Sequence, residues 1–403
     1  MEERSQALTV RPGVMGYGAN EVNMKKKVLI ANISQTYGVN GVGAGERLSI
    51  LIDGDGNIER VDAFIAPDPT YDTIDATDLA ISAGWVDVHA HVYKGVGNPS
   101  IDGDLIGPRT GVTVIVDAGS AGHLTYGGFE EYIVKKKDYA IFEFLNLGSV
   151  GVMGANDYAI DDFIEKAETV SCIEAHRSSI KGVKVRACKY VLKERGREIV
   201  EDAKDVACRA GVPLMVHIGE PGPTYAEVLA CLDSGDIVTH CFHGKPGNIL
   251  DGESHRVISA AVEAKERGVL FDVGHGAASF NYHVCQQSIR QGFLPDFIGT
   301  DLHRSSIKEK VISLPVTMSK MLACGLDPEY VVDCVSRRPR QMLQIEDFQG
   351  DTLVGKRADF TLFSLSSESK EYIDSEGNPI RTTQQFYPYF TIVGPNVTAC
   401  QHA

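Results

Sequence analysis

Residues 84–93 read GWVDVHAHVY, an apolar run in which His89 and His91 stand two positions apart. In a β-strand alternate side chains point to the same face, so the two imidazoles would lie together at the end of the strand. Two neutral ring nitrogens on one face are a suitable beginning for a metal site. Taken alone, the pattern is explained more simply by a pair of hydrogen-bonded structural histidines, so the rest of the chain has to decide.

Seven further runs of this kind follow, separated by gaps long enough for helices. They are VTVIVDAG (112–119), AIFEFLNL (140–147), IKGVKVR (180–186), VPLMVH (212–217), DIVTH (236–240), GVLFDVGHG (268–276) and DFIGTD (296–301). Their content of Val, Ile and Phe is typical of buried parallel strands. Two gaps, 196–211 and 254–268, carry helical patterns that end in glycine, the residue favoured just after a helix.

Eight such strands alternating with helices favour an α/β fold, a (β/α)8 TIM barrel. A doubly wound open sheet is the alternative. Against it, no G-x-G-x-x-G follows the first run, and polar residues close nearly every run.

The two flanks of the barrel are rich in short strand patterns and in D-G and G-N turn signals. Neither flank is long enough to build a stable core alone, so we expect them to pair into one small β-sandwich. The sequence thus predicts a mobile tail (1–23), a discontinuous sandwich domain (24–80 and 345–403) and a metal-hydrolase barrel (81–344).

Composition narrows the class of protein. The formal net charge is -15 over 403 residues, which argues against nucleic acid or an anionic membrane as a partner and leaves a small-molecule substrate. The nine cysteines form no C-x-x-C pair, and the N-terminal segment lacks the apolar core of a signal peptide. We therefore expect reduced thiols and a cytoplasmic location; whether the chain forms a homo-oligomer stays open.

Active sites of TIM barrels lie at the carboxyl ends of the strands. Side chains able to bind metal or to carry charge close five of the eight predicted strands. They are His89, His91, Lys184, Arg186, His217, His240 and Asp301. Each alone has a structural explanation, such as an ion pair for the lysine or a helix cap for the aspartate. Together they predict one polar cluster at the mouth of the barrel.

At this point the chain resembles the amidohydrolase superfamily, and within it the deacetylase-type branch. The resemblance is carried by DVHAHVY, VDAGSAG, GVKVR, THCFHGKPGNI, FDVGHGAASF, GTDLH and GKRADFTLF, in this order, and it spans about residues 24–400. It implies a metal-dependent hydrolase that cleaves an acyl group, most plausibly acetyl, from a small amide or ester.

The resemblance also implies roles for the residues at the mouth. His89 and His91 would bind the more buried of two divalent ions, expected to be zinc, and His217 and His240 the more exposed one. Lys184 would carry a carbamate formed from CO₂ and bridge both ions. Asp301 would bind the buried ion and move the proton as the catalytic acid and base.

Substrate contacts are expected from Arg186, Tyr93 and His243. Arg186 faces the same interior as Lys184 and would stabilise an oxyanion or hold a carboxylate. A cyclic-amide hydrolase of the dihydroorotase type is the alternative function. Dihydroorotases have an H-x-H-x-R pattern, and in this sequence Tyr93 occupies the position of the arginine. A non-catalytic barrel kept for assembly is a weaker alternative, because all six implied ligands are present.

Overall fold

Seven parallel strands form the wall of a barrel in the computed structural model, which describes residues 22–23, 26–38, 47–153, 163–192, 195–345 and 353–401. The strands are β8 (Trp85–Ala90), β9 (Val112–Asp117), β10 (Ala140–Asn146), β11 (Ile180–Ala187), β12 (Leu214–Ile218), β13 (Ile237–Thr239) and β14 (Leu270–Asp272). Their order in the sheet is their order along the chain. Five lie within runs that the sequence predicts as strands, and β11 and β12 each extend one residue beyond theirs.

The eighth predicted strand, 296–301, closes this sheet without forming a continuous ladder. It is joined to β14 by a parallel bridge between Asp272 and Phe297, and Leu302 forms a second parallel bridge with Ala90 of β8. The amide of Asp301 also donates to the carbonyl of His89 over 2.6 Å. Because the segment bonds to the first and the seventh strand, the prediction of a (β/α)8 barrel is confirmed.

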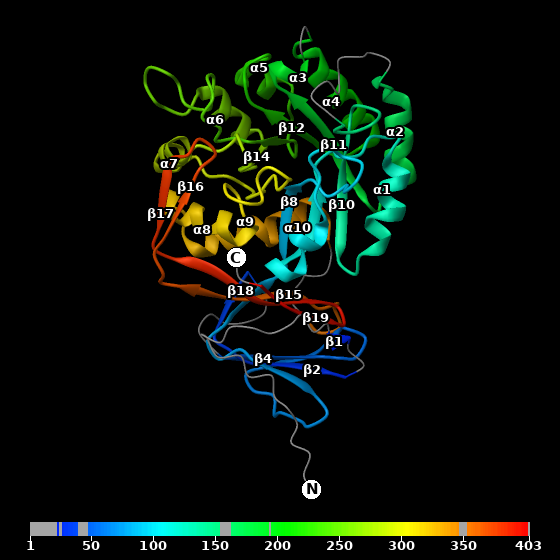
Figure 1. Ribbon diagram of the computed structural model, residues 1–403, viewed down its shortest axis with the longest axis vertical. Coiled ribbons are helices and arrows are strands. Elements are labelled where there is room, and N and C mark those ends of the chain that lie inside the picture. The colour runs from blue at the N-terminus through cyan, green and yellow to red at the C-terminus, as the bar shows by residue number, and fades with distance from the viewer. Residues whose placement is uncertain are drawn as a thin grey trace.

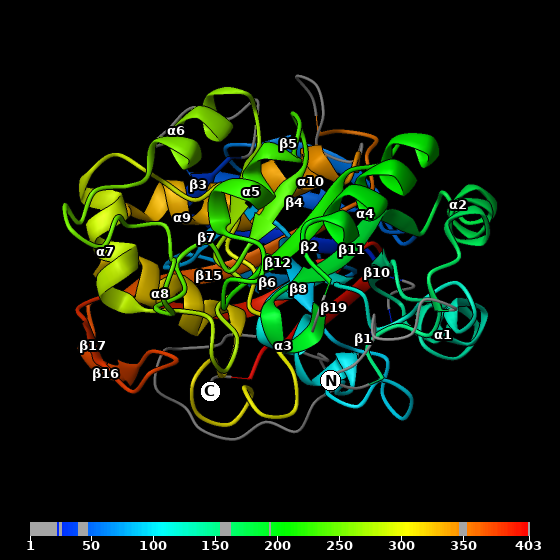
Figure 2. The same ribbon diagram turned by 90° about the horizontal axis from the view of Figure 1, so that it is seen from above.

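Helices surround the barrel, as Figure 2 shows from above. They are α1 (Tyr126–Tyr132), α2 (Lys166–Ala175), α3 (Lys189–Leu192), α4 (Glu198–Ala210), α5 (Tyr225–Ala230), α6 (Ser259–Glu266), α7 (Tyr282–Arg290), α8 (Leu314–Cys324), α9 (Pro328–Val335) and α10 (Arg337–Met342). Short 3-10 turns cover Gly103–Leu105, Pro108–Thr110 and Val134–Lys136.

The two helices expected from their glycine endings differ in outcome. Helix α4 ends at Gly211, which has a φ of 65° as a left-handed cap requires. Helix α6 begins at Ser259 and not near residue 254. The carboxylate of Asp251 accepts hydrogen bonds from the amides of Glu253 and Ser254, which holds this stretch in a turn.

Two further sheets lie below the barrel in Figure 1. The six-stranded sheet consists, in order, of β1 (Val22–Asn23), β19 (Asn396–Ala399), β18 (Gln385–Val393), β15 (Asp359–Ser366), β7 (Ala80–Ala83) and β3 (Gln35–Tyr37). The four-stranded sheet consists of β5 (Ile58–Asp62), β4 (Leu48–Ile52), β2 (Val28–Ile33) and β6 (Asp72–Asp75). Both chain ends therefore contribute to one small β domain, as the predicted fold class requires.

The six-stranded sheet is the middle layer of the molecule. From β15, Phe360 and Leu362 pack into the core shared with the four-stranded sheet. Phe363 packs instead on Trp85 at the start of the first barrel strand, with ring centroids 5.2 Å apart. One strand thus joins the sandwich core to the barrel core.

A separate two-stranded hairpin, β16 (Lys370–Ile373) and β17 (Pro379–Thr382), leaves this domain and rises along the side of the barrel past α8. Residues 1–21 of the predicted tail lie outside the described residues, and Val22 and Asn23 pair with β19. The domain boundaries given from the sequence stay predictions. Among the described helices, none has the length and apolar character needed to cross a membrane.

Candidate metal centre

Strand alternation brings Lys184 and Arg186 to the inside of the barrel. Val183 and Val185, between and beside them on β11, belong to the apolar core outside the sheet. The stem of Lys184 lies against Gly119, where an added Cβ would be 2.8 Å from the lysine Cγ. A glycine is therefore needed after β9 for the lysine to point into the mouth.

His89, His91 and Asp301 form the most compact set of candidate ligands. One possible ligand atom from each lies within 4.8 Å of the other two. Oδ1 of Asp301 is 3.6 Å from Nε2 of His89 and 3.3 Å from Nε2 of His91. Two imidazoles and a carboxylate converging in this way are a ligand set that divalent transition metals accept.

Hydrogen bonds fix which nitrogen of His89 faces the cluster. Thr239 donates its hydroxyl proton to Asp272 over 2.6 Å, so its oxygen accepts the proton on His89 Nδ1 over 2.8 Å. Nε2 of His89 then keeps a lone pair directed at the cluster. Metal-binding histidines usually have this arrangement, in which the ring nitrogen that does not face the metal donates a hydrogen bond toward a carboxylate.

His240 and His217 form a second pair of nitrogens. Nδ1 of His240 lies 2.5 Å from the carbonyl oxygen of Gly274, which can only accept, so Nδ1 carries the proton. Nε2 of His240 lies 2.9 Å from Nδ1 of His217. The other nitrogen of His217 is buried and has no hydrogen-bond partner among the described residues. This pair has donor atoms available for a ligand.

Burial lowers the pKa of His89, His217 and His240 well below the ordinary value for histidine. Nearby cations add to the effect, Lys184 among them. The three rings are therefore neutral at neutral pH, which is the form that binds metal.

Lys184 lies between the two sets of ligands and is 1% exposed. Its Nζ is 3.2 Å from Nε2 of His89 and 3.4 Å from the sulfur of Met215. Burial lowers the pKa of Lys184 to about 7, although Asp301 and Asp272 oppose the shift. A substantial fraction of this amine is therefore uncharged at neutral pH and able to act as a nucleophile.

Two of the candidate ligands have a strained backbone. His240 has a φ of 68° and Asp301 a φ of 49°, both in the left-handed region. Each such residue costs about 1–3 kcal/mol and is retained where the surroundings enforce it. His240 follows the last residue of β13, and Asp301 ends a segment that forms only isolated bridges, so strand alternation alone would not have given their orientation.

Burial by itself raises the pKa of the Asp301 carboxyl, but neighbouring rings, those of His303 and His89 first, hold its pKa well below its usual range. Asp301 is therefore ionised at neutral pH. His303, whose role the sequence left undecided, has Nδ1 2.6 Å from the Asp301 carbonyl oxygen and 3.7 Å from its Oδ1. It is a neighbour of the site that strand-end reasoning missed.

The three predicted substrate contacts are placed differently. Arg186 on β11 is paired with His217 on β12, two positions closer to the carboxyl end of β11 than Lys184. His243 is 1% exposed, and neither of its ring nitrogens has a hydrogen-bond partner among the described residues. Burial lowers the pKa of His243 to about 4, so the ring is neutral. Tyr93 donates its hydroxyl to the Thr125 carbonyl over 2.9 Å and packs on Phe129, away from the ligand cluster.

Sequence reasoning also missed the buried acids that support the ligands. Asp272 lies behind His89, and Asp117 accepts from the amides of Val92 and Ser120, which frame His91. Ser120 Oγ lies 2.9 Å from Nδ1 of His91. The signal was present, because both aspartates are acids within the predicted strand runs of β9 and β14.

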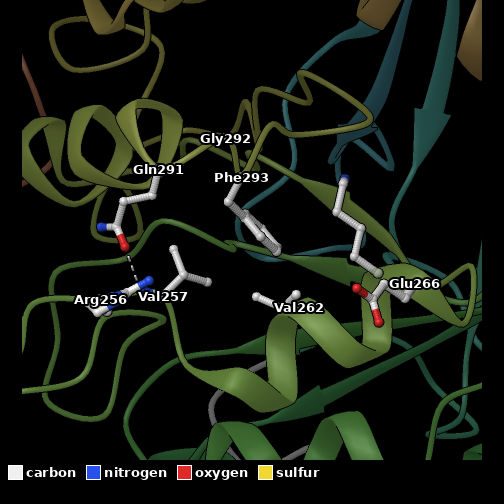
Figure 3. A pocket seen from close by; sticks show the side chains of 8 residues that line it. Arg256, Val257, Val262, Glu266, Gln291, Gly292 and Phe293 are labelled. Carbon is white, nitrogen blue, oxygen red and sulfur yellow. Dashed lines mark hydrogen bonds between the residues drawn. The ribbon is translucent and has the colours of Figure 1, made fainter.

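A groove elsewhere on the surface has a volume of about 320 Å³ and is shown in Figure 3. Its lining residues are Arg256, Val257, Val262, Lys265, Glu266, Gln291, Gly292 and Phe293. Helix α6 and the residues that follow α7 form this groove, and it contains none of the candidate ligands. The candidate ligands thus lie at the strand ends and outside this groove.

Comparison with known proteins gives a consistent assignment. A family model described as a deacetylase-like composite domain matches residues 353–397. The chain is 37% identical over 383 residues to the deacetylase Atu3266 of Agrobacterium fabrum, covering 93% of this chain and 92% of that protein. It is 31% identical to a deacetylase of Enterococcus faecalis, covering 79% and 86%.

Solved structures extend the comparison to the whole fold. A structure titled as a dihydroorotase has a TM-score of 0.87 and 36% identity, and the match covers 94% of this chain and 98% of that one. A structure titled as an adenine deaminase has a TM-score of 0.85 and 30% identity, with 92% and 99% covered. The barrel and the small β domain are thus shared with structures whose titles name different activities.

Proposed function

Since the chain belongs to the deacetylase-type branch of the amidohydrolase superfamily, we propose that it removes an acyl group from a small amide or ester. This superfamily is a group of metal-dependent hydrolases, and acetyl is the acyl group that we propose first. The observation that carries the proposal is the convergence of neutral histidines, a depressed-pKa lysine and an ionised aspartate at the mouth of one barrel. Such a convergence of perturbed groups is expected at a catalytic site.

The donor set fits two divalent ions, which we take to be zinc. His89, His91 and Asp301 would hold one ion, and His217 and His240 the other. The buried Nε2 of His217, which has no hydrogen-bond partner among the described residues, supports this assignment. So does the lone pair that the Thr239 contact leaves on Nε2 of His89, beside the Lys184 amine. Bound there, the ions would polarise the substrate carbonyl and acidify the attacking water.

Lys184 would join the two halves of the centre as a carbamate. An uncharged amine adds to CO₂ and releases a proton to solvent, and the product is an anion with two oxygens. The pKa of about 7 for Lys184 and its burial at 1% exposure support this chemistry. A charged ammonium at the same place would repel the cations that the histidines are arranged to bind.

Asp301 would act as the base and then as the acid. Its low pKa keeps it ionised, so it can accept a proton from the attacking water and return it to the leaving nitrogen or oxygen. Arg186 would stabilise the developing oxyanion or hold a substrate carboxylate, and His243 would contact the substrate through its unpartnered ring. Tyr93 stays a weaker expectation, because its hydroxyl already bonds to Thr125.

A cyclic-amide hydrolase of the dihydroorotase type is the second candidate, favoured by the structural similarity at 36% identity. Against it, the deacetylase relatives are similar in identity over nearly the same length, and Tyr93 gives no cation for a substrate carboxylate. We further propose a cytoplasmic location, which the nine free cysteines support.

The test is a substrate screen of the purified protein with its metal content measured. We expect about two zinc ions per chain, and turnover of N-acetyl amino acids or acetylated hydroxy acids, with dihydroorotate unchanged. Removal of the metal with a chelator should abolish turnover, and added zinc should restore it. Turnover of dihydroorotate without deacetylation would favour the second candidate, and a protein that binds no metal would overturn both.

A further inference from the structure

The β16–β17 hairpin brings the small β domain to the mouth of the barrel. In Figures 1 and 2 it leaves the sheet region and passes beside α8 to the neighbourhood of α7. Its turn, residues 374–378, is held in shape by Asp374, whose Oδ1 accepts from the amides of Glu376 and Asn378. Oδ2 of Asp374 accepts the amide of Tyr282 at the start of α7 over 2.9 Å. The turn is thereby fixed to the barrel.

Ser375, in this turn, is 4% exposed and contacts the loop that follows β14. Its hydroxyl is shared between the carbonyls of Gly276 over 2.9 Å and His275 over 3.2 Å. The same oxygen accepts the amide of Phe280 over 3.2 Å. One side chain of the small domain therefore satisfies three backbone groups of a barrel loop.

Two lysines complete this contact. Lys310, in the loop after the eighth barrel segment, donates to the carbonyl of Ser375 over 2.6 Å and to that of Ala277 over 3.0 Å. The buried Lys320 donates to Nε2 of His275, to the carbonyl of Ile373 at the end of β16, and to the carbonyl of Lys310. Three acceptors match the three protons of an ammonium, so the lysine joins the loop, the hairpin and the segment after the eighth strand.

The loop held in this way lies directly against Asp301. A Cβ at Gly276 would be only 2.4 Å from Oδ2 of Asp301, so the backbone of Gly276 is in contact with the carboxylate. The amide of Gly276 donates to the carbonyl of Thr300 over 2.9 Å, next to Asp301 in the chain. Movement of this loop would change the space in which the carboxylate rotates.

We propose that Ser375 is a positioning residue of the active site, through which the small β domain holds the His275–Ala277 loop against the Asp301 carboxylate. The proposal rests on the proposed function for the role of Asp301, but the contact itself does not. An acid–base group must be aligned with the reacting atoms, and a misplacement of about 1 Å can cost a factor of about 100 in rate. Ser375 thus links the sandwich to a step that takes place in the barrel.

The experiment compares Ser375→Ala with Ser369→Ala. Ser369 stands at the exposed base of the same hairpin and contacts Arg381 instead of the loop. We expect Ser375→Ala to lower kcat about tenfold while KM stays within about twofold, because the substrate contacts are left in place. Metal content should match the parent, and Tm should fall by a few degrees because three buried backbone groups lose a partner. Ser369→Ala should match the parent in every respect.

Two measurements do not depend on the substrate. Hydrogen exchange of the His275 and Gly276 amides should be faster in Ser375→Ala only, and the visible spectrum of the Co²⁺-loaded protein should change in that variant at equal metal content. These readouts support the proposal even where no acyl substrate is turned over, a result that would count against the proposed function alone. Unchanged exchange and spectrum would overturn the proposal, as would losses of kcat, metal and Tm in parallel.

Discussion

Buried side chains with nitrogen atoms occur at both ends of the barrel, but their hydrogen-bond partners differ. At the base, the buried Arg340 donates to the carbonyl of Gly84, to Thr113 and to Asp359, at distances between 2.7 and 3.1 Å. At the mouth, His217 and His243 have buried nitrogens with no hydrogen-bond partner in the described part of the chain. At the base the buried cation is thus held by an aspartate and a carbonyl of the protein, whereas at the mouth the buried nitrogens of His217 and His243 are left for a ligand.

The backbone also differs between the mouth and the base of the barrel. At the mouth, His240 and Asp301 have positive φ angles. At the base, Gly84 leaves room for its neighbours, since a Cβ there would lie 2.0 Å from Oδ1 of Asp359 and 2.1 Å from the Thr113 hydroxyl. Two candidate ligands at the mouth thus have left-handed backbone, and at the base a glycine provides the space in which the two parts of the molecule join. A change at the mouth should affect metal and turnover, and a change at the base should affect stability.

The largest expected effect is that of Lys184→Ala at the mouth. Without the lysine no carbamate can form, so we expect loss of metal and of all turnover above background. Metal analysis and the acyl-substrate screen measure both, and short carboxylic acids with bicarbonate should restore part of the activity. A variant with full zinc and normal turnover would falsify the proposed centre.

Asp301→Asn should have the next largest effect. The amide keeps an oxygen that can bind metal weakly but cannot accept a proton, so turnover should fall by roughly two to four orders of magnitude. Most of the metal should remain, which distinguishes this variant from Lys184→Ala. If steady-state assays gave near-normal turnover, the acid–base role would pass to another residue, with His243 and His275 examined first.

At the base, Arg340→Met should reduce stability and leave the chemistry intact. The change leaves Asp359 and the Gly84 carbonyl buried without their cationic partner, at a cost of about 3–5 kcal/mol. Below the unfolding temperature, kcat should stay within about twofold of the parent.

Arg337→Met is the matched control in the same helix. Arg337 pairs with Asp333 at the surface, where an ion pair contributes less than about 1 kcal/mol. Denaturant unfolding of both variants gives the comparison. Equal stabilities would show that the buried contacts of Arg340 contribute no more than a surface ion pair.

Sequence predicted the barrel and the positions of the candidate ligands because both follow from local patterns. Apolar runs gave the strands, and the polar residues near the ends of these runs gave His89, Lys184 and His217. The left-handed backbone of His240 and Asp301 has no such local signal, because it is enforced by neighbours distant in the chain. The contact of Ser375 with the loop after β14 joins residues about one hundred positions apart, so no periodicity could have predicted it.

The smallest expected effects come from one substitution made at both ends, Thr239→Val at the mouth and Thr361→Val at the base. Valine keeps the shape of threonine and is well tolerated in strands, so only the hydroxyl is lost. Thr239 lies between His89 and Asp272, and its loss should weaken metal binding by roughly 10–100-fold. The stability loss there should be small, because Asp272 is already 3.4 Å from His89 and can accept its proton directly.

Thr361 accepts the amide of Trp85 over 3.1 Å and donates to the carbonyl of Gly111 over 2.8 Å. Its loss leaves both backbone groups buried without this partner, at a cost of about 1–3 kcal/mol, and should not change metal affinity. In metal titration Thr239→Val should therefore be the weaker binder, and in denaturant unfolding Thr361→Val should be the less stable protein. The same ranking in both assays would mean that the two ends of the barrel are energetically coupled and that the contrast between them does not hold.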